Sequence, residues 1–237
     1  MNTPHDVNQL TFLEHLEELR WRLLKTVSAI TAATLLAFVF HRPLVTWLLK
    51  PTGSLQLIFT APAEYFMVTL RVAFFAGLYL SLPVLLYQVI AFIAPGLTAA
   101  ERRWTLPMLA AAFLLFTSGA LFSYFFLLPV GLKFLVGFAP EGIAPMLSIG
   151  SYLSFAASLV FASGLSFELP LVLFFLSLMG IVSSAKLMNF RRYFLIVALV
   201  VAAVVTPSPD IFTQGMLALA LMALYELSIV LIKGIKR

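Results

Sequence analysis

Glu168 is the ionisable residue that stands out most clearly, because it lies deep in an apolar stretch between Ser151 and Gly180. A charge at the centre of a bilayer costs about 2.5–3.5 kcal/mol on insertion scales, so such residues usually face a cavity or a partner. Pro170 follows two residues later and is expected to free a backbone carbonyl. Two interpretations stay open: Glu168 is a protonated structural residue bonded to a neighbouring helix, or it lies on a polar path for something hydrophilic.

Three glutamates precede the first long apolar run, on a segment over residues 11–25 that predicts an amphipathic helix. Such a helix can lie on a membrane surface, but anionic lipid attracts Lys and Arg rather than Glu. Glu18 and Arg22 are four residues apart, so they can form an ordinary surface ion pair. The acidity argues that lipid binding is not the whole role of this segment.

The connection over residues 91–103 combines an aromatic ring with a further carboxylate. Pro95 and the glycine after it end a helix and turn the chain. Glu101 follows Thr98 at capping-box spacing, so it can serve simply as a cap for the next helix. With Phe92 beside it, the same carboxylate would suit a cation that has apolar neighbours, and both interpretations stay open.

Weaker candidates lie in and near the other apolar runs. Asp210 follows a proline and is expected to cap the helix that comes next, and Gln214, one turn further on, is a modest intramembrane hydrogen-bonding site. Glu226 is expected to reach lipid headgroups or Lys233. Pro83 is expected to kink the second apolar run.

The residue inventory speaks against enzymatic chemistry. The histidines are His5, His15 and His41, and the only aspartates are Asp6 and Asp210. A rhomboid-type serine protease needs a membrane histidine, and an intramembrane aspartyl protease needs two membrane aspartates. The sequence has no cysteine, phosphate loop, dinucleotide fingerprint or zinc HExxH pattern. We therefore expect no catalytic residues, no metal and no cofactor.

These residues must be positioned by membrane-spanning helices. Of the 237 residues, 62% are hydrophobic and 11% are charged, which is too apolar and too poor in charge for a soluble domain. A crossing needs about 20 apolar residues, and runs that are apolar on every side favour helices over barrel strands. The sequence therefore predicts an all-α integral membrane protein with one transmembrane domain over residues 1–237. The six spans are expected near residues 22–40, 66–88, 104–127, 151–178, 192–206 and 211–231.

The fifth span is short, and the basic residues are distributed unevenly. Only 14 residues separate Arg192 from Pro207, which gives about 21 Å of helix against a hydrocarbon core of about 30 Å. Of the 15 Lys and Arg residues, eleven fall on the side of both termini and four on the other, which places both termini in the cytoplasm. The cations are spread along the chain rather than clustered, which speaks against nucleic-acid binding.

Five segments carry a family resemblance, in order along nearly the whole chain. They are residues 12–20 (FLEHLEELR), 81–89 (SLPVLLYQV), 92–97 (FIAPGL) together with 101–103 (ERR), 166–170 (SFELP) and 206–210 (TPSPD). These segments closely resemble the TatC family. TatC is the multispanning core subunit of the bacterial twin-arginine protein translocase.

The resemblance implies a receptor for folded proteins that carry a twin-arginine signal peptide. It also implies a concave bundle of six spans with a short fifth and sixth. Matching positions place the cytoplasmic recognition surface at Glu18, Arg20, Phe92, Pro95, Glu101 and Arg103. A guanidinium pairs bidentately with a carboxylate and lysine is a poor substitute, which would explain an acidic helix on the positive side.

Within the membrane, the resemblance implies that Glu168 makes the concave face polar and helps to insert or couple the signal peptide and partner helices. Pro51, Pro83, Asp210 and Gln214 match positions of functional interest whose roles are less defined. The implied partners are the single-span subunits TatB and TatA on spans five and six, and further copies of the chain in a homo-oligomeric receptor complex. Transport would use the proton-motive force across the bacterial cytoplasmic (inner) membrane.

Two other classes of function stay open. One is a small-solute or ion transporter in which Glu168 is the coupling carboxylate. The other is a purely structural scaffold for other membrane proteins.

Overall fold

The structure, a computed structural model, describes residues 12–53, 55–93, 105–137, 146–206 and 210–235. In this part of the chain, six helical stretches are long and apolar enough to cross a membrane. The predicted all-α fold with six spans is therefore confirmed. The fifth and sixth stretches, with 22 and 24 residues, are the shortest of the six, as expected.

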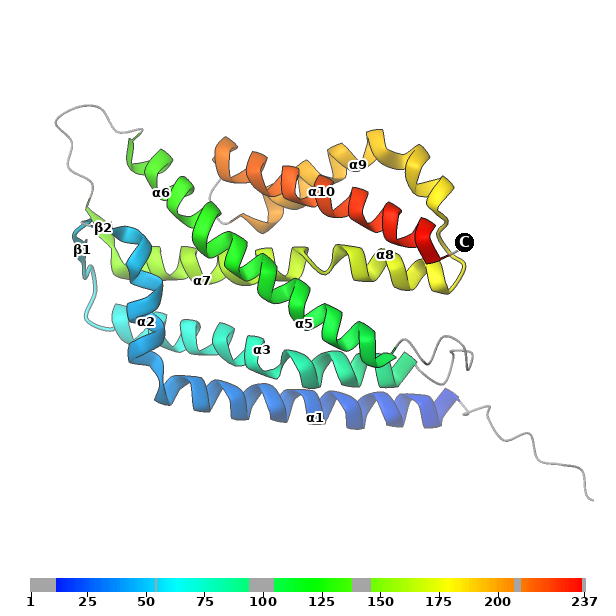
Figure 1. Cartoon of the computed structure of the whole chain (residues 1–237). Helices are drawn as coiled ribbons and strands as arrows, with labels where there is room; N and C mark the ends of the chain where they lie inside the picture. Colours follow the sequence, from blue (N-terminus) through cyan, green and yellow to red (C-terminus); the bar gives the residue numbers. More distant parts are fainter. Residues whose placement is uncertain (1–11, 54, 94–104, 138–145, 207–209, 236–237) are drawn as a thin grey trace, which may run out of the picture.

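The elements follow one another as shown in Figure 1. They are α1 (Phe12–Val39), α2 (His41–Leu49), the short 3₁₀ helix η1 (Lys50–Thr52), β1 (Leu57–Ile58), α3 (Glu64–Ile93), α5 (Thr105–Phe122), the π-helical segment η3 (Ser123–Leu127), α6 (Leu128–Gly137), β2 (Leu147–Ser148), α7 (Ile149–Ser166), α8 (Leu169–Leu178), α9 (Ser184–Val205) and α10 (Ile211–Ile235). The third span consists of α5, η3 and α6, and the fourth consists of α7 and α8. α1 begins and α10 ends at the same end of the bundle, on the right in Figure 1, which we call the terminal end. The opposite end, which carries β1 and β2, is the loop end.

Two helices are longer than the apolar runs within them. Residues 11–25 and 22–40 were expected as an amphipathic segment and a span, but residues 12–39 form one continuous helix, α1. This stretch contains no Gly or Pro that would interrupt a helix. α9 begins at Ser184, where the Ser183 side chain accepts a hydrogen bond from the Lys186 amide, so basic residues occupy its first turns. Its 22 residues give about 33 Å of helix.

The helices pack as neighbouring pairs around a central fourth span. α1 packs along α3, α5 and α3 both contact α7, and α9 pairs with α10, which also contacts α8. α1 and α3 meet closely at Gly77, where an added Cβ would lie 2.6 Å from the Cα of Thr34. Fully buried side chains from four elements fill the centre, among them Leu127, Leu128, Leu153 and Leu217. Apolar side chains cover the outside of the bundle, as a lipid-facing surface requires.

A single carboxylate joins the connections at the loop end. Glu64 Oε2 accepts hydrogen bonds from the amide and hydroxyl of Thr60, both at 2.6 Å, and from the amide of Ala61 at 3.2 Å. Glu64 Oε1 accepts from the Ser148 hydroxyl and, at 2.7 Å, from the Gly150 amide. β1 and β2 pair in parallel beside it, with Leu57 opposite Leu147. Glu64 thus ties the start of α3 to the start of α7.

Candidate functional site

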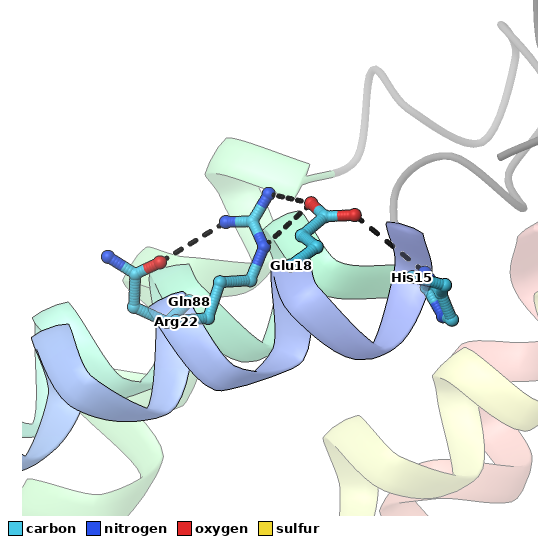
Figure 2. Close-up of polar contacts among 4 residues, drawn as sticks. All are labelled: His15, Glu18, Arg22 and Gln88. Atoms are coloured by element: carbon cyan, nitrogen blue, oxygen red, sulfur yellow. Dashed lines mark hydrogen bonds and ion pairs between the residues drawn. The ribbon is translucent and has the colours of Figure 1, made fainter. Parts of the chain in front are cut away.

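The terminal end of the bundle carries a cluster of polar side chains between α1 and α3. It consists of His15, Glu18 and Arg22 on α1 with Gln88 and Phe92 on α3, and we call it the α1–α3 polar cluster. Figure 2 shows the Arg22 guanidinium between the Glu18 carboxylate and the Gln88 amide. Arg22 Nε donates to Glu18 Oε1 at 2.8 Å, and Arg22 Nη1 donates to Gln88 Oε1 at 3.1 Å. The cluster thus joins the two helices through Arg22 and Gln88, which are 66 residues apart in sequence.

Helical spacing explains why these side chains meet. His15, Glu18 and Arg22 are three and four residues apart, so they line one side of α1. Gln88 and Phe92 are four residues apart and line one side of α3 in the same way. The His15 ring stacks on the Phe92 ring, with centroids 4.3 Å apart and an angle of 14° between the planes. The aromatic pair therefore closes the cluster toward the end of α3.

The two oxygens of the Glu18 carboxylate have different partners. Arg22 Nη2 also donates to Glu18 Oε1, so both guanidinium contacts reach the same oxygen. The nearest partner of Oε2 among the described residues is His15 Nδ1 at 3.7 Å, which is too long for a hydrogen bond. The Glu18 and Arg22 side chains are each 23% exposed. Oε2 therefore has no hydrogen-bond donor among the described residues.

The predicted recognition residues divide into three groups. The ion pair between Glu18 and Arg22, which the sequence left open, is present, and Phe92 lies in the same cluster. Arg20 is exposed and stands about 200° round α1 from Glu18, because each residue turns the helix by about 100°. Pro95, Glu101 and Arg103 lie outside the described residues.

Glu168 occupies a break in the fourth span. α7 ends at Ser166 and α8 begins at Leu169, so the expected single span over residues 151–178 is interrupted at Phe167 and Glu168. The Glu168 side chain is 8% exposed, and both carboxylate oxygens lack a hydrogen-bond partner among the described residues. The interpretation in which a neighbouring helix bonds Glu168 therefore finds no support in this part of the chain. An unpartnered buried carboxylate is costly to keep and indicates a role beyond packing.

Polar contacts hold α9 against α10. Asp210 Oδ1 accepts a hydrogen bond from the Thr213 amide at 2.6 Å, which confirms the predicted cap of the sixth span. Gln214 Nε2 donates to the Leu199 carbonyl at 3.2 Å and so bonds across the two helices. Glu226 pairs with Arg191 rather than with Lys233, since its Oε2 accepts from Arg191 Nη2 at 2.6 Å, and contact with lipid headgroups stays a prediction. Helix packing brings this arginine of α9 closer than the lysine two turns along α10.

The two prolines of interest occupy ordinary positions. Pro51 lies in η1, at the loop end, and is half-buried. α3 continues through Pro83 as a single helix over Glu64–Ile93. A kink at Pro83 stays a prediction.

Two residues that organise the site and the fold were not predicted from the sequence. For Gln88, the available signal is its position four residues before Phe92, on the same side of α3. For Glu64, it is the position as first residue of α3, because acidic residues favour helix N-termini. Among the described residues, no group of three or more His, Cys, Asp or Glu side chains is arranged to hold a metal ion.

Comparison with known proteins gives a consistent result. A family model described as Sec-independent protein translocase protein (TatC) matches residues 14–219. The chloroplastic Sec-independent protein translocase protein TATC of Arabidopsis thaliana is 42% identical over 222 residues, which cover 93% of this chain and 65% of that protein. The TatC of a Synechocystis strain is 37% identical over 222 residues, with 94% and 87% of the two chains covered.

Solved structures agree with the sequence comparison. A crystal structure described as the twin arginine translocase receptor TatC in DDM matches with a TM-score of 0.82 at 38% identity, and covers 92% of this chain and 99% of the other. A second crystal structure of the same receptor matches with a TM-score of 0.80, also at 38% identity, over 94% and 100% of the two chains. The overall arrangement of the helices thus follows a known architecture, and the chain is a member of the TatC family of Sec-independent protein translocase proteins.

Proposed function

We propose that this chain binds twin-arginine signal peptides at its terminal end and forms the receptor and core of a translocase that exports folded proteins. The observation that carries the proposal is Glu18 Oε2, which has no hydrogen-bond donor among the described residues and lies 3.7 Å from Nδ1 of His15, the ring that stacks on Phe92. A carboxylate in a cluster with aromatic rings suits a guanidinium, which forms charge-assisted hydrogen bonds and stacks on aromatic faces. Glu101, Arg103 and Pro95 would complete the surface from the connection after α3.

A peptide-binding assay tests this proposal directly. We expect a fluorescent peptide with an arginine pair to bind the purified full chain in detergent, and a lysine-pair peptide to bind much more weakly. Glu18→Gln and Glu101→Lys should each weaken binding of the arginine peptide. The matched control Glu226→Gln should leave this binding unchanged, because Glu226 pairs with Arg191 on α9. Equal binding of both peptides to the unaltered chain would contradict the proposal.

We further assign the terminal end to the cytoplasmic side of a bacterial cytoplasmic membrane. Most Lys and Arg residues flank this end, as the positive-inside rule expects. The chain has no native cysteine, so single cysteines report sidedness without background. A cysteine at Trp21, which is 57% exposed, should resist a membrane-impermeant thiol reagent in intact cells, and one at Phe59, which is 65% exposed at the loop end, should react. The reverse pattern would invert the assignment.

The α9–α10 pair is the proposed docking place for the single-span subunits TatB and TatA. Its support is the outward face of α9, where Val200 is 56% exposed and Val204 is 81% exposed. A cysteine at Val204 should form disulfides with a cysteine in the partner helix, and a cysteine at the buried Ala202 should not. If the cysteine at Val204 formed no crosslinks, this docking place would be contradicted. Further copies of the chain are expected in the same receptor complex.

Glu168 is the proposed intramembrane element of transport, which we expect to draw on the proton-motive force. The second candidate function, a small-solute or ion transporter with Glu168 as coupling carboxylate, is favoured by the same unpartnered oxygens. Two sets of liposomes, one with this chain alone and one with the single-span partners added, separate the two. Flux of small solutes that Glu168→Gln abolishes would support the transporter, whereas export of a folded reporter that needs the single-span partners would support the translocase.

A further inference from the structure

The carboxylate that we propose as a receptor for arginine already holds an arginine of its own. Arg22 donates from Nε to Glu18 Oε1 at 2.8 Å and from Nη2 to the same oxygen. Its third contact, from Nη1 to Gln88 Oε1, is 3.1 Å long and comes from the neighbouring helix. Figure 2 shows these contacts as one chain across α1 and α3. A peptide arginine therefore meets an occupied site rather than an empty one.

The contacts of Arg22 limit what an incoming guanidinium can do. The strongest pairing uses two parallel N–H···O bonds, one to each carboxylate oxygen. Since Arg22 uses Oε1, an incoming group can reach only Oε2 while Arg22 stays in place. Full bidentate pairing with Glu18 thus requires Arg22 to leave that oxygen.

Arg22 can leave without disturbing the fold. Its side chain is 23% exposed, so it can rotate toward water while the backbone of α1 stays helical. The Gln88 oxygen remains a partner for Nη1 on the side of α3. The exchange is therefore a change of side-chain partners within one cluster.

The geometry points to Arg22 as an internal competitor that sets the specificity of the site, an inference that rests on the proposed function. A peptide arginine replaces the guanidinium of Arg22 with another guanidinium, so the exchange at Glu18 is nearly balanced. The remaining peptide contacts then decide the affinity. A peptide lysine offers a point charge without the planar fork, so it cannot replace what Arg22 provides. The internal arginine therefore weakens the binding of a lysine peptide more than the binding of an arginine peptide.

A purely positioning role for Arg22 makes the opposite prediction. If Arg22 served only to hold Glu18 in the right rotamer, its removal would weaken every peptide alike. If Arg22 competes, its removal frees both oxygens of Glu18 and strengthens binding. The two roles therefore differ in the sign of the effect on affinity, and also in the ratio between arginine and lysine peptides.

The test measures the dissociation constants of an arginine-pair and a lysine-pair peptide for the full chain carrying Arg22→Gln. We expect the arginine peptide to bind about two- to fivefold more tightly than to the unaltered chain, the range that a partly exposed ion pair provides. The lysine peptide should gain more, so the ratio of the two dissociation constants falls. Arg191→Gln is the matched control, because it removes an arginine from another ion pair and should leave both constants unchanged.

Arg22→Lys keeps the positive charge without the fork, and it should give an intermediate ratio. It also decides the matter if Arg22→Gln fails to fold. Weaker or unchanged binding of both peptides to these variants would overturn the competitor role. Failure of the proposed function looks different, since the unaltered chain would then bind both peptides equally and Glu18→Gln would change neither constant.

Discussion

Gly77 is the position where one methyl group tests the pairing of α1 with α3. A Cβ at Gly77 would lie 2.6 Å from both the Cα and the backbone nitrogen of Thr34, and it would also overlap the Thr34 hydroxyl. The hydroxyl can rotate away, but the backbone atoms move only with α1. Gly77→Ala must therefore push the helices apart. The distance from the new Cβ to the Thr34 backbone has to grow from 2.6 Å to at least the 3.4 Å of an ordinary contact.

The magnitude follows from two opposing effects. Overpacking of a well-packed contact costs about 1–3 kcal/mol, and membrane helices depend on small residues for close approach. Alanine offsets up to about 1 kcal/mol by its better helix propensity. We expect a net loss of about 1–2 kcal/mol in the free energy of unfolding. Gly215→Ala is the matched control, because no atom lies within 4 Å of its Cβ and only the propensity gain applies.

Two measurements check the prediction. Titration of the protein in mixed micelles with SDS, followed by circular dichroism, gives the free energy of unfolding for each variant. Spin labels on cysteines at the exposed positions Leu35 and Leu80 report the distance between α1 and α3. Equal unfolding curves for Gly77→Ala and Gly215→Ala, with no change in the label distance, would refute the close-contact argument.

Three further outcomes are expected. Glu64→Gln should speed amide hydrogen exchange at Thr60 and Gly150, because the neutral side chain has only one acceptor oxygen for the donors that face it; protection equal to that of the unaltered chain would contradict the loop-end role. Glu168→Leu should raise the free energy of unfolding by about 1–3 kcal/mol, because it removes an unpartnered buried carboxylate. The same variant should abolish export, and a lower free energy of unfolding in SDS titration would indicate a partner of Glu168 outside the described residues. Tyr225→Phe should cost about 0.5–1.5 kcal/mol by losing the bond to the Leu187 carbonyl, with an unchanged helical circular dichroism spectrum, since the stacking on Phe194 remains; an unchanged free energy of unfolding would show that this bond adds nothing.

Periodicity and charge spacing were enough to predict the six spans, because a lipid-embedded helix must be apolar on every side. They were less suited to helix ends. Residues 12–25 differ from the following span in polarity, yet both belong to α1, since a change of solvent along a helix does not interrupt its backbone hydrogen bonds. For the same reason α9 begins eight residues before the expected start near residue 192, and these residues are Ser184–Arg191.

The candidate site was predictable only within a helix. The pairing of Glu18 with Arg22 follows from a spacing of four, which sequence displays directly. The partner Gln88 depends on the register between α1 and α3, which no local pattern encodes. Glu226 illustrates the same limit, because its partner was sought along α10 and lies across the helix pair, on α9.

The marginal burial of α1 has a consequence for how the protein is made. In this first span only 6% of the most apolar 18-residue stretch is buried, so α1 can rest in lipid before any other helix exists. During synthesis it can therefore insert alone and wait for α3 to emerge. Two contacts then align α1 with α3: Gly77 packs closely against Thr34, and Gln88 accepts a hydrogen bond from Arg22. The earliest tertiary step of biogenesis would thus also assemble the α1–α3 polar cluster, the site proposed for the signal peptide.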